Sequence, residues 1–466
     1  MNFLGIDVGT TSVKTTLFDG DLSPIVSLTA DYTLTSSGDR VEFDAERYFE
    51  IIRGEIEKIE REHRIDALAI DTQCETLILT DEAGTPLYPA IVWLDNRATK
   101  EAEQIEAKFG KKRVYEVTGQ PEITATWPAA KLLWMRQNEP EIFSRVKRIF
   151  LLEDWLLFKM TGKFVTERTL QSSTIYFNIH TGEYWDEMLD FIGVSREMLP
   201  TLFGSAEQIG EYRGAKVVTG AIDQIAGAIG AGVVKKGLVS VMTGTTMVLF
   251  MPSDEVPPYD EASIVPCHYN YDGKYCLLSW TPTAGMALKW FKNALCESFS
   301  FKDLDALAEA VPAGSAGVTF LPYLCGSTMP KYNPEARGSF TGLTTEHTRG
   351  HFVRAVMESV ASMLRANLEY LGLETEEIRA MGGGAQSPLW CQMKADMTGK
   401  RLVTLKNKET ACLGSAILAA VGVGYFDSVE QAAERVVEPD RVFLPGETDY
   451  TECYERYLSY DKLLNN

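Results

Sequence analysis

Hydrophobic and polar positions alternate in two stretches that each predict a strand, a tight turn and a second strand. Residues 4–18 form the first stretch, with Gly9-Thr10-Thr11 at its turn, and residues 239–250 form the second, with Gly244-Thr245-Thr246. Both stretches are rich in β-branched residues, as is typical of strands. The two turns lie 235 residues apart, about half of the chain. This spacing predicts two similar halves facing each other, with a chance recurrence of a common turn as the alternative.

Helical and strand patterns alternate between and after these hairpins. Residues 44–62 carry an apolar stripe at helical spacing, and Asp44 stands where an N-cap is expected. Short apolar runs predict further strands. The expected strands are 67–70 and 76–79, and the expected helices are 128–137, 139–160 and a long helix after Gly350. Strands mixed with helices of 10–20 residues predict an α/β architecture in both halves.

The boundary between the two halves is expected near residues 233–237, just before the second hairpin. This gives an N-terminal domain, 1–236, and a C-terminal domain, 237–466. The polar and aromatic tail, about 440–466, is expected to form a helix that packs back on the N-terminal domain.

Composition and charge narrow the function classes. The chain has 466 residues, 45% of them hydrophobic, and a net charge of −20. So acidic a protein repels phosphate backbones and anionic membranes, which disfavours nucleic acid or a membrane as the main partner. No apolar run is long enough to span a bilayer, and the first residues lack the basic region of a signal peptide. Eight cysteines without a C-x-x-C pair predict a cytoplasmic protein, and the histidine spacing predicts no zinc site.

The first turn offers chemistry suited to an anion. Glycine lets a ligand approach the backbone closely, the hydroxyls of Thr10 and Thr11 are donors, and Lys14 adds a positive charge nearby. Asp7, at the end of the preceding strand, is a candidate for holding hydrated Mg²⁺. The alternative is a structural hairpin in which Asp7 caps the turn.

A second candidate site surrounds Asp223. A helix is expected to begin there, and its first turns consist mainly of glycine, alanine and isoleucine, so that a ligand or another backbone can lie close to it. An acidic side chain at a helix start is ionised and points outward, which suits a general base that removes a proton from a hydroxyl group. A plain N-cap is the alternative.

A third candidate is the glycine run 382–384, which follows a short strand and precedes a helix. Such a run lets the chain pass closely under a flat ligand or a phosphate. The sequence contains no G-x-G-x-x-G fingerprint, no Walker P-loop and no G-x-S-x-G elbow, which disfavours a dinucleotide enzyme and a serine hydrolase.

Taken together, these segments resemble the FGGY family of carbohydrate kinases, within the actin-like ATPase superfamily. The resemblance runs nearly from end to end, and the matching pieces occur in the family's order. They are residues 5–11, 91–97, 131–134, 220–224, 243–246, 320–326, 333–343 and 382–396. The resemblance implies two ribonuclease-H-like domains flanking a deep cleft, with ATP bound mainly by the C-terminal half and the sugar by the N-terminal half.

The resemblance also implies roles for individual residues. Asp223 matches the family's catalytic base, and Asp7 matches the aspartate near Mg²⁺ and the phosphates. The other expected nucleotide contacts are Thr10, Thr11, Gly244 and Thr245 at the two phosphate turns, and Gly383, Gly384 and Ala385 in the adenosine-binding loop. Positioning, charge neutralisation and one base suffice for phosphoryl transfer. ATP, ADP and a small sugar or polyol are the expected partners, and the sequence leaves the oligomeric state open, a homodimer included.

The substrate segment gives a mixed signal. Trp93 and Asp95 match the family's sugar site, where an indole packs on the carbon skeleton and a carboxylate accepts from hydroxyl groups. Gln73-Cys74-Glu75-Thr76 resembles the Gln-Arg-Glu-Thr of glycerol kinases but has cysteine in place of arginine. Asp223-Gln224 is also similar to glycerol kinases, whereas residues 320–326 and 333–343 resemble xylulokinases. Losing the arginine removes donors to a terminal hydroxyl group, so we expect a larger ketose such as xylulose, with glycerol or another short polyol as the alternative.

Two other classes of function are alternatives to a sugar kinase. A non-catalytic, actin-like sensor of sugar or nucleotide is disfavoured by the intact Asp223 and by the Trp93 segment. A nicotinamide enzyme is disfavoured by the missing dinucleotide fingerprint.

Overall fold

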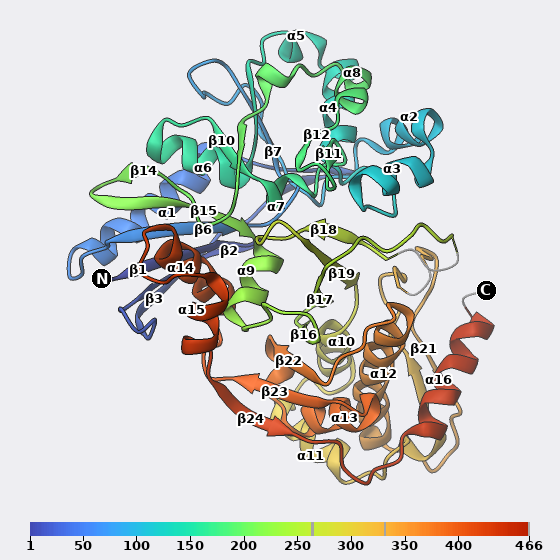
Figure 1. Cartoon of the computed structure of the whole chain (residues 1–466). Coiled ribbons are helices and arrows are strands. Elements are labelled where there is room, and N and C mark those ends of the chain that lie inside the picture. Colours follow the sequence, from blue (N-terminus) through green and yellow to red (C-terminus); the bar gives the residue numbers. More distant parts are fainter. Residues whose placement is uncertain (262–264, 330–331, 465–466) are drawn as a thin grey trace. The chain divides into compact units, whose positions relative to one another are not determined.

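The computed structural model describes residues 1–261, 265–329 and 332–464 (Figure 1). The chain divides into two compact units. Unit 1 comprises Met1–Val234, Ser253–Cys276 and Glu409–Val437, and unit 2 comprises Lys235–Pro252, Leu277–Lys408 and Glu438–Asn466. The first change of unit lies close to the boundary expected after residue 236. The two later segments of unit 1 differ from that expectation, because the sequence placed them in the C-terminal domain.

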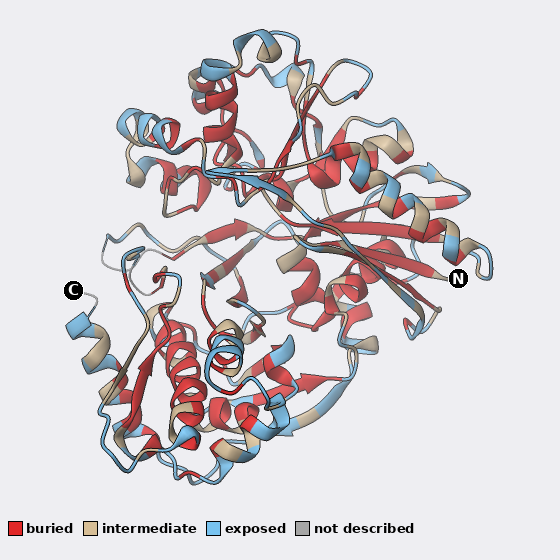
Figure 2. Cartoon of the chain, turned by 180° about the vertical axis from the view of Figure 1, so that it is seen from behind, coloured by how far each residue is buried: buried red, intermediate tan, exposed pale blue. Residues whose placement is uncertain are grey.

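The main sheet of unit 1 has the strand order β14-β15-β6-β1-β2-β3. Strands β15, β6 and β1 are parallel neighbours, whereas β1 and β2 form the expected antiparallel hairpin with Val8 opposite Val13. Residues of β1, β6 and β15 are almost all buried, and these central strands are red in Figure 2, whereas the edge strand β3 has no buried residue. The strands are β1 Phe3–Val8, β2 Ser12–Phe18, β3 Pro24–Asp31, β6 Ala67–Thr72, β14 Gln208–Tyr212 and β15 Ala215–Ile222.

A second sheet of unit 1, with the order β4-β5-β8-β7-β9, and a set of helices complete this part of the fold. Its strands are β4 Thr35–Ser37, β5 Arg40–Phe43, β7 Leu77–Thr80, β8 Ala90–Ile91 and β9 Arg148–Leu151. The short strands outside both sheets are β10 Val165–Glu167, β11 Phe177–Asn178, β12 Glu183–Tyr184 and β13 Thr201–Phe203. Strand β18 Cys267–Tyr269 is hydrogen-bonded to β19 Tyr275–Thr281 as the edge strand of a seven-stranded sheet. The α-helices are α1 Ala45–Glu60, α2 Thr99–Phe109, α3 Lys111–Thr118, α4 Pro128–Asn138, α5 Pro140–Phe143, α6 Leu152–Thr161, α7 Arg168–Gln171, α8 Asp186–Ile192, α9 Asp223–Gly230, α14 Thr410–Gly422 and α15 Val429–Val436.

The prediction of one helix over residues 139–160 is wrong for the middle of this range. A single turn of helix, α5, is followed by strand β9, and only then does α6 begin. Strand β9 pairs antiparallel with β7, with Leu151 opposite Leu77, and three of its four residues are buried. The apolar run Ile149-Phe150-Leu151 therefore forms a strand because a distant partner strand is available.

Unit 2 has a main sheet in which the strands run β19-β17-β16-β22-β23-β24. Strands β16, β22 and β23 are parallel neighbours, and β16 and β17 form the second expected hairpin, with Thr243 opposite Met247. Each unit thus contains a hairpin joined to two further parallel strands, which confirms the predicted internal similarity. The elements are β16 Leu238–Thr243, β17 Met247–Ser253, β19 Tyr275–Thr281, α10 Gly285–Leu295, α11 Phe301–Glu309, β20 Thr319–Leu321, β21 Ser339–Thr341, α12 Arg349–Tyr370, β22 Glu377–Met381, α13 Pro388–Thr398, β23 Arg401–Leu405, β24 Pro439–Phe443 and α16 Thr451–Leu464.

The C-terminal tail forms the expected helix, α16, but this helix belongs to unit 2. The Tyr323 hydroxyl donates to Asp461 at 2.6 Å and lies 3.1 Å from the hydroxyl of Tyr457. The Tyr454 hydroxyl donates to Glu369 at 2.6 Å. These bonds differ from the expectation that the tail packs on the N-terminal domain, and residues 465–466 lie outside the described part of the chain.

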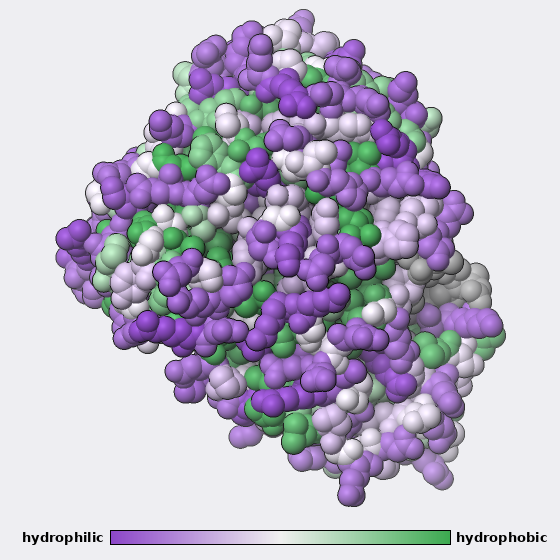
Figure 3. All heavy atoms as spheres, viewed as in Figure 1, coloured by the Kyte–Doolittle hydropathy of each residue, from purple (hydrophilic) through white to green (hydrophobic). Residues whose placement is uncertain are grey.

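The face seen in Figure 3 is covered mainly by hydrophilic side chains, with hydrophobic ones scattered among them. Scattered apolar groups are normal on a protein surface. Among the residues that the structure describes, no helix combines the length and the apolarity needed to cross a bilayer.

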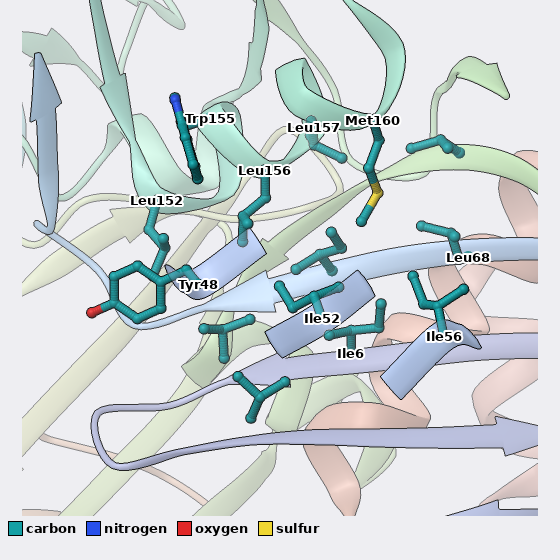
Figure 4. Close-up of a cluster of buried hydrophobic side chains, with 14 of the residues drawn as sticks. Ile6, Tyr48, Ile52, Ile56, Leu68, Leu152, Trp155, Leu156, Leu157 and Met160 are labelled. Atoms are coloured by element: carbon teal, nitrogen blue, oxygen red, sulfur yellow. The ribbon is translucent and has the colours of Figure 1, made fainter. Parts of the chain in front are cut away.

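The core of unit 1 lies where helices α1 and α6 pack against the main sheet (Figure 4). Tyr48, Ile52 and Ile56 of α1 are buried there, as the apolar stripe predicts. The carboxylate of Asp44 accepts from the Glu46 N–H at 3.0 Å, which confirms the predicted N-cap. This core fixes β1 and β6, whose carboxyl ends carry the candidate site.

Helix α14 packs against α9 and β1 through glycines at three points. A Cβ at Gly5 would lie 1.8 Å from the Cys412 carbonyl oxygen, and one at Gly230 would lie 1.8 Å from that of Thr410. Likewise, a Cβ at Gly414 would lie 1.9 Å from the Ala226 carbonyl oxygen. Ala226 and Gly230 of α9 therefore let another backbone approach closely, which is one of the two alternatives expected for that segment.

Candidate active site

Three carboxylates stand at the same edge of the main sheet of unit 1. Asp7 is near the end of β1, Asp71 lies opposite it on β6, and Asp223 follows β15 directly as the first residue of α9. Because parallel strands present their carboxyl ends at one edge, three segments that are distant in sequence meet there. The sequence pointed to Asp7 and Asp223 but not to Asp71, although an acid at the end of a buried apolar run is a usable signal.

Asp71 is completely buried, and Ser415 of α14 donates to its Oδ2 at 2.6 Å. Burial and the charge of Asp7 raise the pKa of Asp71 well above its usual range. Burial also raises the pKa of Asp7 to about 6, while the nearby Lys14 ammonium opposes this shift. The structure thus leaves Asp7, which is only half-buried, as the more accessible carboxylate of the two.

Asp223 is half-buried, and its Oδ1 accepts from the Gln224 N–H at 2.7 Å. The Sγ of Cys74 lies 3.9 Å from the same oxygen. Burial raises the pKa of Asp223 to about 7, and the charge of Asp7 adds to this rise. A carboxylate with a pKa close to neutral is well matched to general-base catalysis.

Buried polar groups hold the backbone just before Asp223. The Ile222 N–H donates to the Thr169 hydroxyl at 3.1 Å, and that hydroxyl donates to Glu167 at 2.7 Å. The Gly220 N–H donates to the buried carboxylate of Glu153 at 3.0 Å. These partners, which the sequence did not point to, hold the backbone before Asp223 in place and so fix the position of Asp223.

Two of the expected sugar contacts are buried and form hydrogen bonds within the protein. Gln73 is buried, and its Nε2 donates to the Tyr48 hydroxyl at 3.2 Å. Asp95 is fully buried and accepts from the Val41 N–H at 2.6 Å and from Arg97 at 2.7 and 2.8 Å. Both oxygens of Asp95 are thus taken up by protein partners, which differs from the expectation that Asp95 binds sugar. The Oε1 of Gln73, in contrast, has no hydrogen-bond partner within the described residues, and Gln73 as a sugar contact stays a prediction.

The remaining sugar-segment residues, Cys74, Glu75, Trp93 and Gln224, are half-buried. Glu75 has a φ of +58°, in the left-handed region that disfavours side chains with a Cβ. Burial raises the pKa of Glu75 to about 8, opposed by Lys131 and reinforced by Asp223. The Trp93 indole N–H donates to the Thr10 hydroxyl at 3.0 Å, so the sugar segment and the first turn are directly connected.

The other groups of the first turn also have protein partners. The Thr11 carbonyl accepts from the Tyr32 N–H at 3.0 Å, and the Tyr32 hydroxyl donates to the carbonyl of Gly9. Lys14 forms an ion pair with Glu409 at 2.6 Å, and both side chains are partly exposed. An anion would have to share the Lys14 ammonium with that carboxylate.

The second turn, in unit 2, is held by the start of α10. The Gly285 N–H donates to the Gly244 carbonyl at 2.8 Å, and the Ala284 and Met286 N–H groups donate to that of Thr245 at 3.0 and 3.1 Å. Thr245 itself is exposed. The carbonyls of this turn are occupied, which leaves the exposed hydroxyl of Thr245 as a donor toward a ligand.

The glycine run follows β22, as predicted. Gly382 has a φ of +78°, and a Cβ at Gly384 would lie 2.7 Å from Thr243. A Cβ at Gly383, in contrast, would have no heavy atom of the described chain within 4 Å. The buried Lys394 donates to the Thr243 hydroxyl at 2.9 Å and so links α13 to the strand before the second turn. Gly383 is therefore the member of the run that faces open space.

Comparisons with known proteins identify the family of the chain. The model of the N-terminal domain of the FGGY family of carbohydrate kinases matches residues 2–239, and that of its C-terminal domain matches residues 239–423. The xylulose kinase of Staphylococcus epidermidis is 31% identical over 479 residues, covering 98% of this chain and 95% of that protein. The gluconokinase of Bacillus subtilis is 28% identical over 495 residues, covering 99% and 96%.

Among solved structures, the ligand-bound xylulose kinase from Lactobacillus acidophilus superposes with a TM-score of 0.93 at 25% identity, covering 100% of this chain and 98% of that one. The expected fold class, two α/β domains of the actin-like ATPase type, is confirmed. The chain belongs to the FGGY family of carbohydrate kinases.

Proposed function

We propose that the protein transfers the γ-phosphoryl group of ATP to a hydroxyl group of a ketose such as xylulose, with Asp223 as the general base. The observation that carries this proposal is the placement of Asp223, half-buried at the start of α9 with the sugar-segment residue Cys74 beside its carboxylate. The similarity to xylulose kinases over nearly the whole chain supports a ketose as the acceptor.

The proposed mechanism uses few groups. Phosphoryl transfer depends mainly on positioning and on neutralising charge. Asp223 would accept the proton of the attacking hydroxyl group at its carboxylate, while Trp93 and Glu75 would orient the sugar. Since the pKa of Asp223 is about 7, a large fraction of the enzyme carries the ionised base near neutral pH.

Asp7 is the residue that would hold Mg²⁺. Mg²⁺ is usually bound by one or two carboxylates, by phosphate oxygens and by retained waters, so a single accessible carboxylate fits such an ion. No group of three or more ligating side chains suitable for a metal occurs within residues 1–261, 265–329 and 332–464, which agrees with an ion held largely by phosphate and water. When bound, the ion would neutralise charge on the phosphates.

The pH dependence follows from the pKa of Asp223. Because burial raises this pKa to about 7, the carboxyl is mostly protonated below pH 7 and cannot accept a proton. We therefore expect kcat/KM for sugar-dependent ADP release to rise with pH through a midpoint near 7. The measurement covers about pH 5.5 to 8.5, a range that spans this pKa. A rate that is flat or falls over this interval would contradict the assignment of a raised carboxyl pKa to the base.

The glycine run is proposed to lie under the adenosine of ATP. Replacing Gly383 by valine puts a branched side chain into the open space beside this loop. We therefore expect KM for ATP to rise at least about tenfold, a change of about 1.4 kcal/mol in binding, while KM for the sugar changes little. Both constants come from one coupled ADP assay with each substrate varied in turn, and an equal rise in both would refute the assignment.

Glycerol or another short polyol is the second candidate substrate. Gln73 and Glu75 favour it, but the neutral thiol of Cys74 supplies none of the donors of an arginine. A panel of pentuloses, hexuloses, polyols, gluconate and glycerol in one coupled assay distinguishes the candidates. We expect a ketose to give the highest kcat/KM. A higher value for glycerol would favour the polyol, and nucleotide and sugar binding without ADP release would favour a sensor.

A further inference from the structure

The segment 131–134 matches the carbohydrate-kinase family, yet the mechanism above gives it no task. Its first residue, Lys131, lies in the first turn of α4 and is completely buried, and its neighbours on the helix, Ala130, Leu132 and Leu133, are buried too. A buried amino group is costly unless it is bonded. A leucine or methionine would fill the same volume without that cost, so the nitrogen of Lys131 needs an explanation beyond packing.

The Nζ of Lys131 donates to two backbone carbonyls from different segments. It lies 3.1 Å from the Glu75 oxygen and 3.0 Å from the Val92 oxygen. Burial lowers the pKa of Lys131 to about 7, while Glu75 and Asp95 oppose this shift. Even the neutral amine has two N–H donors, so both bonds persist in either protonation state.

Each of the two carbonyls belongs to a residue at the sugar segment. Glu75 is held at a positive φ, and it directly follows Cys74, whose Sγ is 3.9 Å from Asp223. Val92 directly precedes Trp93, whose indole N–H bonds to Thr10. One side chain thus joins the backbones that present the sulfur, the carboxylate and the indole.

We propose that Lys131 is a positioning residue that fixes segments 73–76 and 92–95 against each other for binding the sugar. The inference rests on the proposed function for the identity of the ligand. The structural part, the joining of two backbones by one amino group, does not depend on any substrate.

The test compares two buried lysines. Lys131→Met removes both N–H donors while keeping an unbranched side chain of similar length, and leaves two buried carbonyls unpaired. We expect KM for the sugar to rise at least tenfold, with KM for ATP within twofold of wild type. The matched control is Lys394→Met in unit 2, where the lost bond is to Thr243 beside the glycine run, and there the rise should be in KM for ATP instead.

Hydrogen exchange of the purified full-length protein gives a readout without substrate. In Lys131→Met, exchange should quicken in segments 73–76 and 92–95 and stay unchanged in unit 2. Unchanged exchange in both segments, or equal rises in both KM values together with faster exchange throughout unit 1, would overturn the proposal. If Lys131→Met does not fold, Lys131→Gln is used instead, because its shorter side chain keeps an amide donor. We expect exchange in segments 73–76 and 92–95 to quicken in this variant too, but by less. Exchange at the wild-type rate in Lys131→Gln would likewise overturn the proposal.

If the wild-type protein phosphorylates no sugar while exchange changes as expected, the proposed function fails and the positioning role stands. If the sugar is phosphorylated but Lys131→Met leaves its KM and the exchange unchanged, the positioning role alone fails.

Discussion

Replacing Asp223 by asparagine is expected to lower sugar-dependent ADP release by about 10²–10⁴-fold, the usual contribution of a general base. The amide oxygen can still accept from the Gln224 N–H, as the carboxylate does at 2.7 Å, so the start of α9 should be preserved. The amide cannot take up the proton of the attacking hydroxyl group. The rate is measured with saturating sugar and ATP, so that weaker binding does not account for the loss.

Asp186→Asn provides the matched control for Asp223→Asn. Asp186 is also an acid at the first position of a helix, α8 in unit 1, but it is exposed and pairs with Arg196 at 2.5 Å. Surface ion pairs contribute little to stability, so this variant should keep the wild-type rate. Wild-type turnover in Asp223→Asn, or an equal loss in the two variants, would refute the role of Asp223.

The largest expected effect on stability is that of Gly230→Ala. A methyl group there would lie 1.8 Å from the Thr410 carbonyl oxygen and 2.8 Å from the Gly414 nitrogen, both in the backbone of α14. The two helices must move apart, and such overpacking costs about 1–3 kcal/mol of the free energy of unfolding. The change should be visible as a lower midpoint of unfolding in denaturant.

The control for Gly230→Ala lies on the same helix. A Cβ at Gly227 would have no heavy atom within 4 Å among the described residues beyond its own helix. Gly227→Ala should therefore raise the free energy of unfolding by about 0.5–1 kcal/mol, since alanine favours a helix over glycine. Equal shifts in the two variants would show that α14 does not pack on α9 through Gly230.

Much of the fold could be predicted from local signals in the sequence. The two hairpins and the helix behind Asp44 depend on turn residues, a cap and an apolar stripe that all lie within a few residues of one another. Strand β9 could not be predicted in this way, because its pairing with β7 is not local. That residues 409–437 belong to unit 1 could not be predicted for the same reason, because the sequence does not show which distant segment the glycines of α14 pack against.

The candidate site was predictable in position but less so in detail. Residue types and order point to Asp7 and Asp223, whereas the hydrogen bonds that Gln73 and Asp95 make within the protein do not follow from their neighbours in the sequence. Whether a polar side chain faces a ligand or the core depends on such tertiary partners. Segment 131–134 is recognisable in the sequence, but the role of Lys131 is not, because the carbonyls of Glu75 and Val92 that it bonds are distant in sequence.

Phosphorus NMR of a reaction with the wild-type protein, ATP, Mg²⁺ and xylulose tests the central claim most directly. The account predicts that ADP and a sugar phosphate ester appear in equal amounts, and that no ester forms with Asp223→Asn. ATP converted only to ADP and inorganic phosphate, at a rate that no ketose in the panel changes, would contradict it.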